Sequence, residues 1–184
     1  MHKITFITGN QSKADYLSKY LGVSVDHCKL DLDEIQSLDL HKIVEHKVKQ
    51  AFEEIQTPVI VEDVSLEFVA LGRLPGPFIK FFVDEVPFET ICRMLDGQTR
   101  KAIARCIFGY YDGTVLEFFE GTMHGEIALT PAWESWFGWD KIFIPDGYAV
   151  TRAQLNEEQY KESYAKSKAF GPLKEFLLQR NTAG

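Results

Sequence analysis

Thr8, Gly9, Asn10 and Lys13 lie where a short apolar run gives way to a helical pattern. A helix N-terminus attracts anions through its free N–H groups and its positive dipole end, and a lysine in the first turn adds charge. These residues could therefore hold a phosphate group. The segment is shorter and looser than a Walker A loop, so on the motif alone an ordinary strand-to-helix connection with a solvated lysine is the simpler interpretation.

A second group of candidates is acidic. Glu62 and Asp63 directly follow the buried-strand pattern of Val59–Val61, and Asp33 and Glu34 lie in an earlier loop. Open α/β sheets bind ligands at the carboxyl ends of their strands, and magnesium takes carboxylate oxygens together with water and phosphate. Adjacent residues of a continuing strand point to opposite faces. We therefore expect one of the two adjacent carboxylates to serve a site; solvated strand-end charges are the alternative.

Lys47 is the third candidate because of its place in a predicted helix. On a helical wheel for Asp39–Ile55, Lys47 falls inside the apolar stripe, whereas Lys42 and Lys49 fall on the opposite face. A lysine on the core side of a helix either extends to an edge or meets an anion there. The pattern indicates Lys47 as the lysine to test.

The fourth candidate is the stretch WESWFGWD, Trp133 to Asp140. Aromatic rings beside a glycine and a carboxylate could form a wall on which a nucleotide base stacks. The alternative is a hydrophobic turn that closes one end of the core.

Composition limits the other classes of function. The net charge of −7 excludes wholesale binding to a nucleic-acid backbone, which needs a basic face, but not the binding of one nucleotide. The five histidines show no HxH or HExxH spacing, so we expect no zinc site. The three cysteines form no CxxC pair, which favours reduced thiols and a cytoplasmic location. The opening is too short and too soon polar for a signal peptide, and no apolar run approaches the roughly 20 residues of a membrane span.

The pattern of elements predicts an α/β protein with a long hairpin. Period and turn signals predict strands at Ile4–Thr8, Val59–Val61, Lys101–Tyr111, Thr114–Gly121, Gly125–Leu129 and Lys141–Ile144, and helices at Ser12–Leu21, Asp39–Ile55, Phe88–Leu95 and from Asn156 to the end. Gly171-Pro172 should interrupt or kink that last helix. No repeat or linker divides the chain.

Four motifs, in this order, resemble those of the inosine triphosphatase (Ham1) family. They are ITFITGNQSK, LDLDEIQ, VIVEDVSLEFVALGRLPGPFIKFF and FGWDKIFIPDGY, and they extend across nearly the whole chain. Four motifs with sensible spacing are far more specific than any one of them.

The resemblance implies a fold and a reaction. The fold is a two-lobed α/β domain over residues 1–184, with a long mixed, twisted β-sheet and a central substrate cleft. The reaction is the magnesium-dependent hydrolysis of non-standard purine triphosphates such as ITP, dITP and XTP to the monophosphate and pyrophosphate, a form of nucleotide-pool sanitation. The resemblance also implies a homodimer, with no membrane or nucleic-acid partner.

The resemblance also implies roles for individual residues. Glu34 and Asp63 would hold Mg²⁺, with Asp63 also orienting the attacking water. The phosphates would be bound by Thr8, Gly9, Asn10, Lys13, Lys47 and Lys80, and the base and sugar would be bordered by Phe137, Gly138, Trp139 and Asp140. Such a cradle suits phosphoryl transfer, which depends mainly on positioning and charge neutralisation.

The chain departs from the family near its end. The family has a lysine followed by Ser-His-Arg, of which the His and Arg read the purine. Without gaps, Tyr164, Ala165 and Lys166 take the Ser-His-Arg places, and Lys161 lies one position after the usual lysine. Lys161 and Lys166 thus become the candidate base contacts. The altered segment leaves open a pyrophosphatase for a different nucleotide, and a non-catalytic nucleotide sensor is the other alternative.

Overall fold

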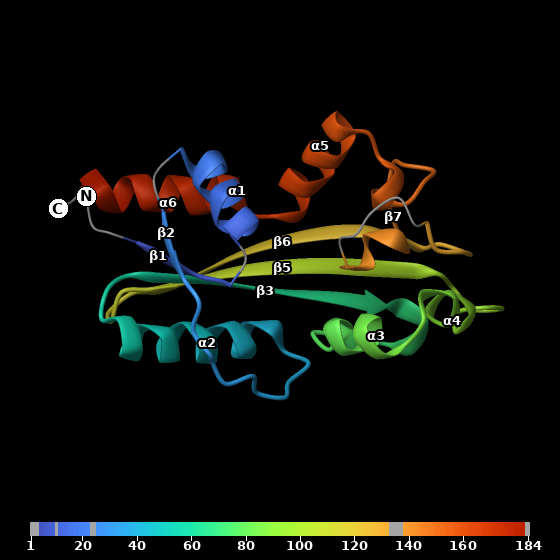
Figure 1. Ribbon diagram of the computed structural model, residues 1–184, viewed down its shortest axis with the longest axis horizontal. Helices are drawn as coiled ribbons and strands as arrows, with labels where there is room; N and C mark the ends of the chain where they lie inside the picture. Colours follow the sequence, from blue (N-terminus) through green and yellow to red (C-terminus); the bar gives the residue numbers. More distant parts are fainter. Residues whose placement is uncertain (1–3, 10, 23–24, 133–137, 183–184) are drawn as a thin grey trace. The chain divides into compact units, whose positions relative to one another are not determined.

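Residues 4–9, 11–22, 25–132 and 138–182 are described by a computed structural model (Figure 1). The chain divides into two units by its internal contacts. The first unit comprises Met1–Asp63, Cys106–Glu120 and Ala169–Gly184, and the second unit comprises Val64–Arg105 and Gly121–Lys168. No helix of the described residues is long and apolar enough to cross a bilayer.

The strands form one seven-stranded sheet. Its strands are β1 (Thr5–Ile7), β2 (Asp26–Cys28), β3 (Val59–Phe68), β4 (Pro75–Gly76), β5 (Lys101–Tyr111), β6 (Leu116–Ile127) and β7 (Phe143–Pro145). The order is β2-β1-β3-β5-β6-β7, and β4 pairs with β3. β1 runs parallel to β2 and β3, whereas the β3–β4 and β6–β7 pairs are antiparallel. The predicted α/β class with a mixed sheet is confirmed.

In the first unit, helices cover both faces of the strands. α1 (Gln11–Leu21) and α6 (Phe170–Thr182) lie on one face and α2 (Leu40–Ile55) on the other (Figure 1). The rings of Tyr20 and Phe170 stack with centroids 4.6 Å apart, which joins α1 to α6.

The buried stripe of α2 packs on the sheet. Its contacts form one core cluster of Leu40, Val44, Val48, Ala51, Val59, Val61 and Ile107. The Asp39 side chain caps the helix by accepting the N–H groups of His41 and Lys42. This packing determines which side of α2 faces the sheet, and it thereby determines the direction in which the Lys47 side chain projects.

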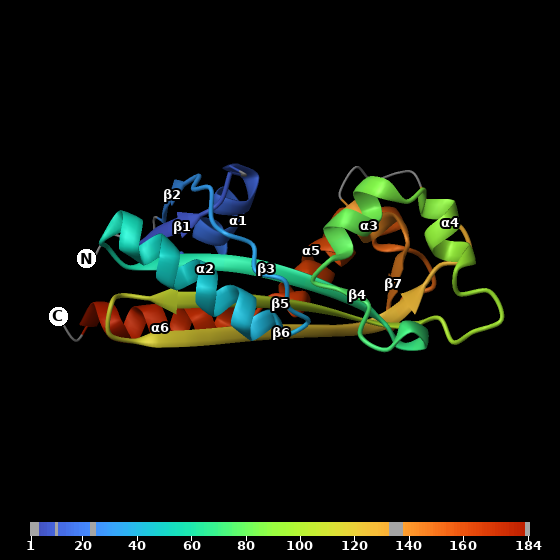
Figure 2. The ribbon, with the colours of Figure 1, turned by 90° about the horizontal axis from the view of Figure 1, so that it is seen from below.

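The second unit has its own core. Its helices are α3 (Ile79–Glu85), α4 (Phe88–Arg93) and α5 (Glu157–Ser167). In Figure 1, α5 and β7 lie above β5 and β6 and α3 and α4 lie below them, and Figure 2 shows α3 near β4. Large buried side chains of this core include Leu66, Phe68, Ile91, Leu95 and Phe143. Asn156 and Gln159 form a capping box that begins α5.

The predicted break between Gly121 and Gly125 is wrong, because both glycines lie inside a continuous strand. We predicted separate strands at Thr114–Gly121 and Gly125–Leu129, but β6 is continuous from Leu116 to Ile127. Its glycines permit close approach: a Cβ at Gly121 would lie 2.5 Å from the carbonyl oxygen of Ser167, and one at Gly125 would collide with that of Ile144.

The last helical stretch is also interrupted at a different place. The break falls at Lys168 and Ala169, between α5 and α6, whereas Gly171-Pro172 lies in the first turn of α6. In a first turn the missing N–H of proline leaves no intrahelical hydrogen bond unmade, so Pro172 is compatible with the helix.

Candidate functional site

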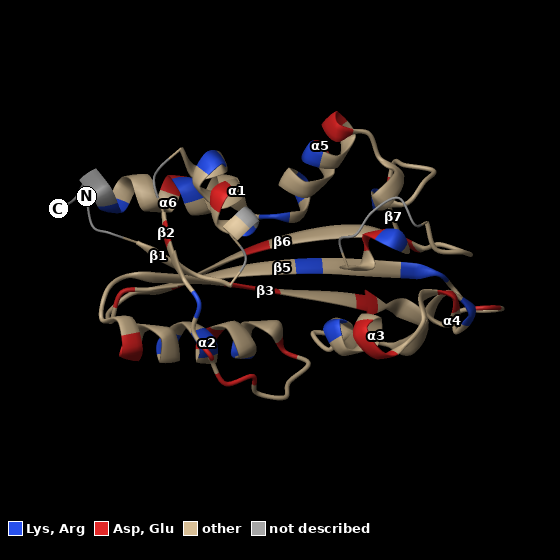
Figure 3. Ribbon diagram, in the orientation of Figure 1, with Lys and Arg blue, Asp and Glu red and all other residues tan. Residues whose placement is uncertain are grey.

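Lys47 joins two carboxylates in the first unit. Its Nζ donates to Asp63 Oδ2 at 2.6 Å and to Glu34 Oε1 at 3.1 Å. Lys47 projects from the middle of α2, Asp63 lies in β3, and Glu34 lies in the acidic loop that precedes α2 (red in Figure 3). We call these three residues the Lys47 cluster. The wheel interpretation of the Lys47 side chain, which is 14% exposed, is confirmed, because Lys49 is 46% exposed and pairs with Glu45.

The charge of Lys47 is held firmly. Burial lowers the pKa of its ammonium group, but the negative charge and hydrogen bond of Asp63, and then those of Glu34, outweigh burial, so that the pKa is raised. Lys47 is therefore a fixed positive charge at any physiological pH, placed between two oxygen donors.

Glu62 points away from the Lys47 cluster. β3 continues through Glu62 and Asp63, so the two side chains take opposite faces of the sheet. Glu62, whose side chain is 4% exposed, accepts a hydrogen bond from Lys13 Nζ of α1 at 3.5 Å. The prediction that adjacent carboxylates would separate is confirmed, and Asp63 is the one that meets Lys47.

The turn that leads into α1 supplies the other candidates of the first unit. The Thr8 N–H donates to the carbonyl of Cys28 at 2.9 Å, which anchors the end of β1 to β2. A Cβ at Gly9 would come within 3.2 Å of the Lys29 side chain, so the turn is packed closely. Asn10 lies outside the described residues.

The remaining predicted residues belong to the second unit, and several are exposed. Lys80 is exposed on α3, and Gly138 adopts a positive φ of 44°. Lys161 and Lys166 pair with Glu157 and Glu162, one turn earlier in α5. Trp139 packs on Phe143 with the ring planes at 88°. Phe137 lies outside the described residues.

Asp140 is buried in the second unit, with 2% of its surface exposed. Tyr160 donates its hydroxyl to Asp140 Oδ2 at 2.9 Å, and Arg152 Nε lies 3.6 Å from Oδ1. Burial raises the pKa of the Asp140 carboxyl, and the charge of Arg152 acts against that rise. The carboxylate is thus turned into the protein, where it joins the Gly138–Lys141 turn to Tyr160 and Arg152.

Sequence reasoning missed Arg152. Its guanidinium lies over the rings of Trp139, Tyr160 and Tyr164, with 5.7, 5.2 and 5.9 Å to the centroids. The one available signal was that Arg152 is the single arginine between Arg105 and Arg180. A buried Asp140 requires a positive partner, but the sequence did not indicate that Asp140 would be buried.

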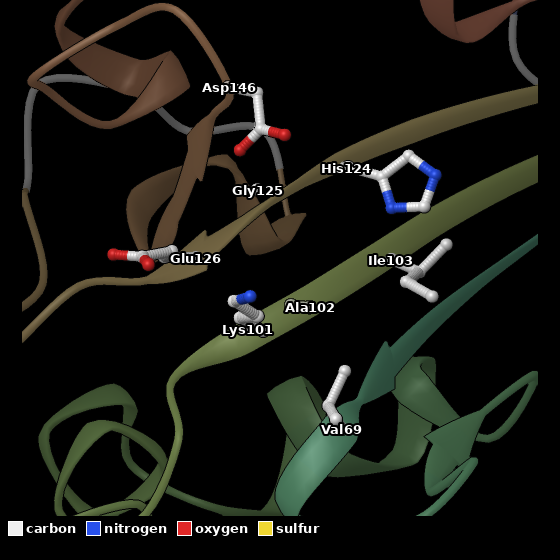
Figure 4. A pocket seen from close by; sticks show the side chains of 8 residues that line it. All are labelled: Val69, Lys101, Ala102, Ile103, His124, Gly125, Glu126 and Asp146. Atoms are coloured by element: carbon white, nitrogen blue, oxygen red, sulfur yellow. The ribbon is translucent and has the colours of Figure 1, made fainter.

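A shallow depression of about 190 Å³ lies elsewhere in the second unit (Figure 4). It is lined by Val69, Lys101, Ala102, Ile103, His124, Gly125, Glu126 and Asp146. None of the predicted site residues lines it, and its charged groups carry both signs. The depression therefore gives no support to the predicted phosphate site.

A metal would find few protein ligands at the Lys47 cluster. Among the described residues no group of three or more His, Cys, Asp or Glu side chains has the arrangement of a metal site. Glu34 and Asp63 do converge on one positive charge, and both offer carboxylate oxygens. Two such ligands fit magnesium, which commonly takes one or two carboxylates and fills its other positions with water and substrate phosphates.

Comparisons with known proteins agree on one family. The model of the Ham1 family matches residues 4–176. The chain is 39% identical over 178 residues to inosine triphosphate pyrophosphatase 2 of Trypanosoma cruzi, covering 94% of this chain and 91% of the relative. It is 36% identical to the inosine triphosphate pyrophosphatase of Yarrowia lipolytica, with 96% of each chain covered.

Solved structures show the same fold. The Ham1 protein of Staphylococcus aureus superposes with a TM-score of 0.83 at 26% identity, covering 97% of this chain and 99% of that one. A HAM1 protein from Coxiella burnetii gives 0.84 at 20% identity, covering 97% and 100%. By family model, sequence identity and fold, the chain belongs to the Ham1 family.

Proposed function

We propose that this chain hydrolyses ITP and related non-standard purine nucleoside triphosphates to the monophosphate and pyrophosphate. The relatives named inosine triphosphate pyrophosphatase support the reaction. The structural observation that carries the proposal is the Lys47 cluster, where a half-buried lysine of α2 meets Asp63, in the middle of β3, and the loop residue Glu34. Such a group can neutralise phosphate oxygens and hold a cation on the same side of the substrate.

Magnesium is the metal we propose. Glu34 and Asp63 would hold it, since hard carboxylate oxygens are the donors that it prefers. When bound, the ion supplies Lewis-acid stabilisation of charge on the phosphate oxygens. Asp63 is in addition the candidate to orient the attacking water, and Lys47 would donate to a phosphate oxygen.

The other binding roles are proposals of the same kind. On the phosphate side they concern Thr8, Gly9, Asn10, Lys13 and Lys80. On the base and sugar side they concern Phe137, Gly138, Trp139, Asp140, Lys161 and Lys166. The buried pairing of Asp140 with Tyr160 and Arg152 supports a role in shaping the turn for the sugar and base.

We further propose that residues 1–184 act as one domain of two lobes, with the substrate in a central cleft, and that the chain forms a homodimer. Closed two-fold assemblies are the commonest among soluble oligomers. A cytoplasmic location is proposed because Cys28, Cys92 and Cys106 are all free thiols.

A panel of nucleoside triphosphates tests the proposal. Purified protein with Mg²⁺ should release pyrophosphate, and not single phosphates, from ITP and XTP faster than from ATP. Chelation of the metal should stop the release. A protein that binds these nucleotides without turnover would be a sensor, and a pyrimidine triphosphate as the best substrate would replace the proposed purine class.

A further inference from the structure

The Nζ of Lys47 occupies the place between Glu34 and Asp63 at which a cation held by both carboxylates would lie. It is within hydrogen-bond distance of one oxygen of each, at 3.1 and 2.6 Å. The ammonium group is a point charge with three donors, so it can satisfy both carboxylates together. The protein therefore neutralises its own candidate metal ligands.

Two of the three groups are held rigidly. Lys47 lies one residue before Val48, which is fully buried in the α2 core, and its own side chain is 14% exposed. Asp63 lies two residues after buried Val61 in β3, and its side chain is 18% exposed. Glu34 differs, because it comes from a loop and is 61% exposed. The Lys47–Asp63 pair is thus preorganised, and Glu34 is the member that can adjust.

Other charges near the cluster have partners of their own. Asp33 Oδ2 lies 3.9 Å from His46 Nε2, a contact that is an ion pair only when the histidine is protonated, and Glu62 meets Lys13 on the opposite face of β3. An incoming divalent cation would therefore compete with Lys47 for Glu34 and Asp63, since two cations cannot share the same oxygens at close range without repulsion.

We infer that Lys47 is a built-in counter-ion that a divalent cation must displace from Glu34 and Asp63, and that the substrate's triphosphate receives the displaced ammonium group. The inference rests on the proposed function for the identity of the anion. It makes metal and nucleotide binding interdependent: the free protein binds the metal weakly, and the nucleotide removes the competitor by offering Lys47 other oxygens.

Binding of Mn²⁺ alone, followed by electron paramagnetic resonance without any nucleotide, tests the competition. Lys47→Met should bind Mn²⁺ at least tenfold more tightly than the unchanged protein. Lys49 lies two residues from Lys47 and is the exposed partner of Glu45. Lys49→Met should therefore change the affinity for Mn²⁺ less than twofold. The double variant Lys47→Met/Asp63→Asn should lose the gain. Equal or weaker binding by Lys47→Met would overturn the inference.

A second measurement uses the unchanged protein and does not depend on the folding of a variant. Acetic anhydride labels free amines, and mass spectrometry reads each lysine. Saturating Mn²⁺ should increase labelling of Lys47 at least threefold while Lys49 serves as the internal control. Unchanged Lys47 labelling overturns the displacement. Because neither measurement involves turnover, a protein that shows both effects and hydrolyses no triphosphate would reject the proposed function and retain this inference.

Discussion

Glu62 and Asp63 are neighbours in β3, yet their carboxylates meet lysines from helices on opposite faces of the sheet. Glu62 accepts from Lys13 of α1, and Asp63 accepts from Lys47 of α2. One step along the strand thus leads from the part-buried Lys13–Glu62 pair to the Lys47–Asp63 pair, which also includes the exposed loop residue Glu34. Because side chains alternate along a strand, the two carboxylates lie in different environments, and only Asp63 is expected to serve the proposed metal.

Asp63→Asn should reduce turnover of ITP by about two to three orders of magnitude with the fold intact, because it removes the negative charge that faces Lys47 and the proposed metal. Glu62→Gln, which keeps an oxygen acceptor for Lys13, should cost less than about tenfold. Steady-state kinetics with Mg²⁺ and circular dichroism measure both effects. Near-full activity of Asp63→Asn would show that the site is misplaced.

Lys47→Ala should lower kcat/KM by about ten- to a hundredfold, since it removes a charge-assisted donor to the substrate. Lys49→Ala should stay within about twofold, because its partner Glu45 lies on the exposed face of α2. The two lysines are separated by one residue, so they form a matched pair. Equal losses from both variants would contradict the assignment of Lys47 to the site.

Gly109→Ala should destabilise the protein by about 1–3 kcal/mol through overpacking. A Cβ at this position of β5 would collide with Val44 of α2 and lie 3.6 Å from Val61, in the core that orients Lys47. Gly171→Ala, in the first turn of α6, is the control: apart from its chain neighbours nothing lies within 4 Å of its Cβ, and the helix preference of alanine is opposed by Pro172, which disfavours helical φ/ψ in the preceding residue, so we expect a change of less than about 1 kcal/mol. Urea unfolding measures both, and similar losses would exclude packing as the cause.

Cys92 should resist alkylation in the native protein. Burial raises the pKa of its thiol to about 11, with the charge of Arg100 acting in the opposite direction. At pH 8.5 only about one thiol in 300 is then ionised, and the thiolate is the reactive form. Iodoacetamide should modify Cys28, which is half-buried, well before Cys92. Rapid native labelling of Cys92, read by mass spectrometry, would contradict this expectation.

The same thiol predicts a pH dependence of stability. Because the folded-state pKa of Cys92 lies above the ordinary value of 9.0, its contribution is fully present below about pH 9 and is lost as the pH rises through about 11. The difference in free energy of unfolding between the unchanged protein and Cys92→Ala should therefore shrink over that interval. A difference that stays constant from pH 8 to pH 11 would argue against the raised pKa.

Local patterns predicted the parts of this structure that depend on periodicity. The α2 helix was predicted from Asp39 to Ile55 and observed from Leu40, with Asp39 as its cap. The core-side placement of Lys47 followed from the same wheel. The separation of Glu62 and Asp63 followed from the two-residue period of a strand.

Contacts between distant segments could not be predicted in this way. The pairing of Lys13 with Glu62 and the burial of Asp140 against Arg152 depend on how elements pack, which a local pattern does not contain. Gly121 and Gly125 misled the prediction of β6, because a glycine that permits close packing and one that breaks a strand look alike in sequence.

This chain should distinguish purine bases less sharply than relatives with the full Ser-His-Arg triplet. The carbonyl at position six is an acceptor, which an arginine fork binds through two fixed donors, whereas Lys166 offers a flexible point charge that already pairs with Glu162 at 2.6 Å. Ala165 provides no polar group where the family has histidine. Loss of one hydrogen bond in a buried recognition site costs about 1–3 kcal/mol, so the preference for ITP over ATP should be about ten- to a hundredfold smaller than in relatives with the full Ser-His-Arg triplet.

Restoring the pair with Ala165→His and Lys166→Arg should widen the margin between ITP and ATP, measured as the ratio of kcat/KM values. Lys161→Arg serves as a control on the same helix, because it changes a lysine that pairs with Glu157 without rebuilding the triplet. A thousandfold preference for ITP in the unchanged protein would show that other residues already read the base. An equal gain from Lys161→Arg would mean that added arginine charge on α5, and not the restored triplet, is responsible.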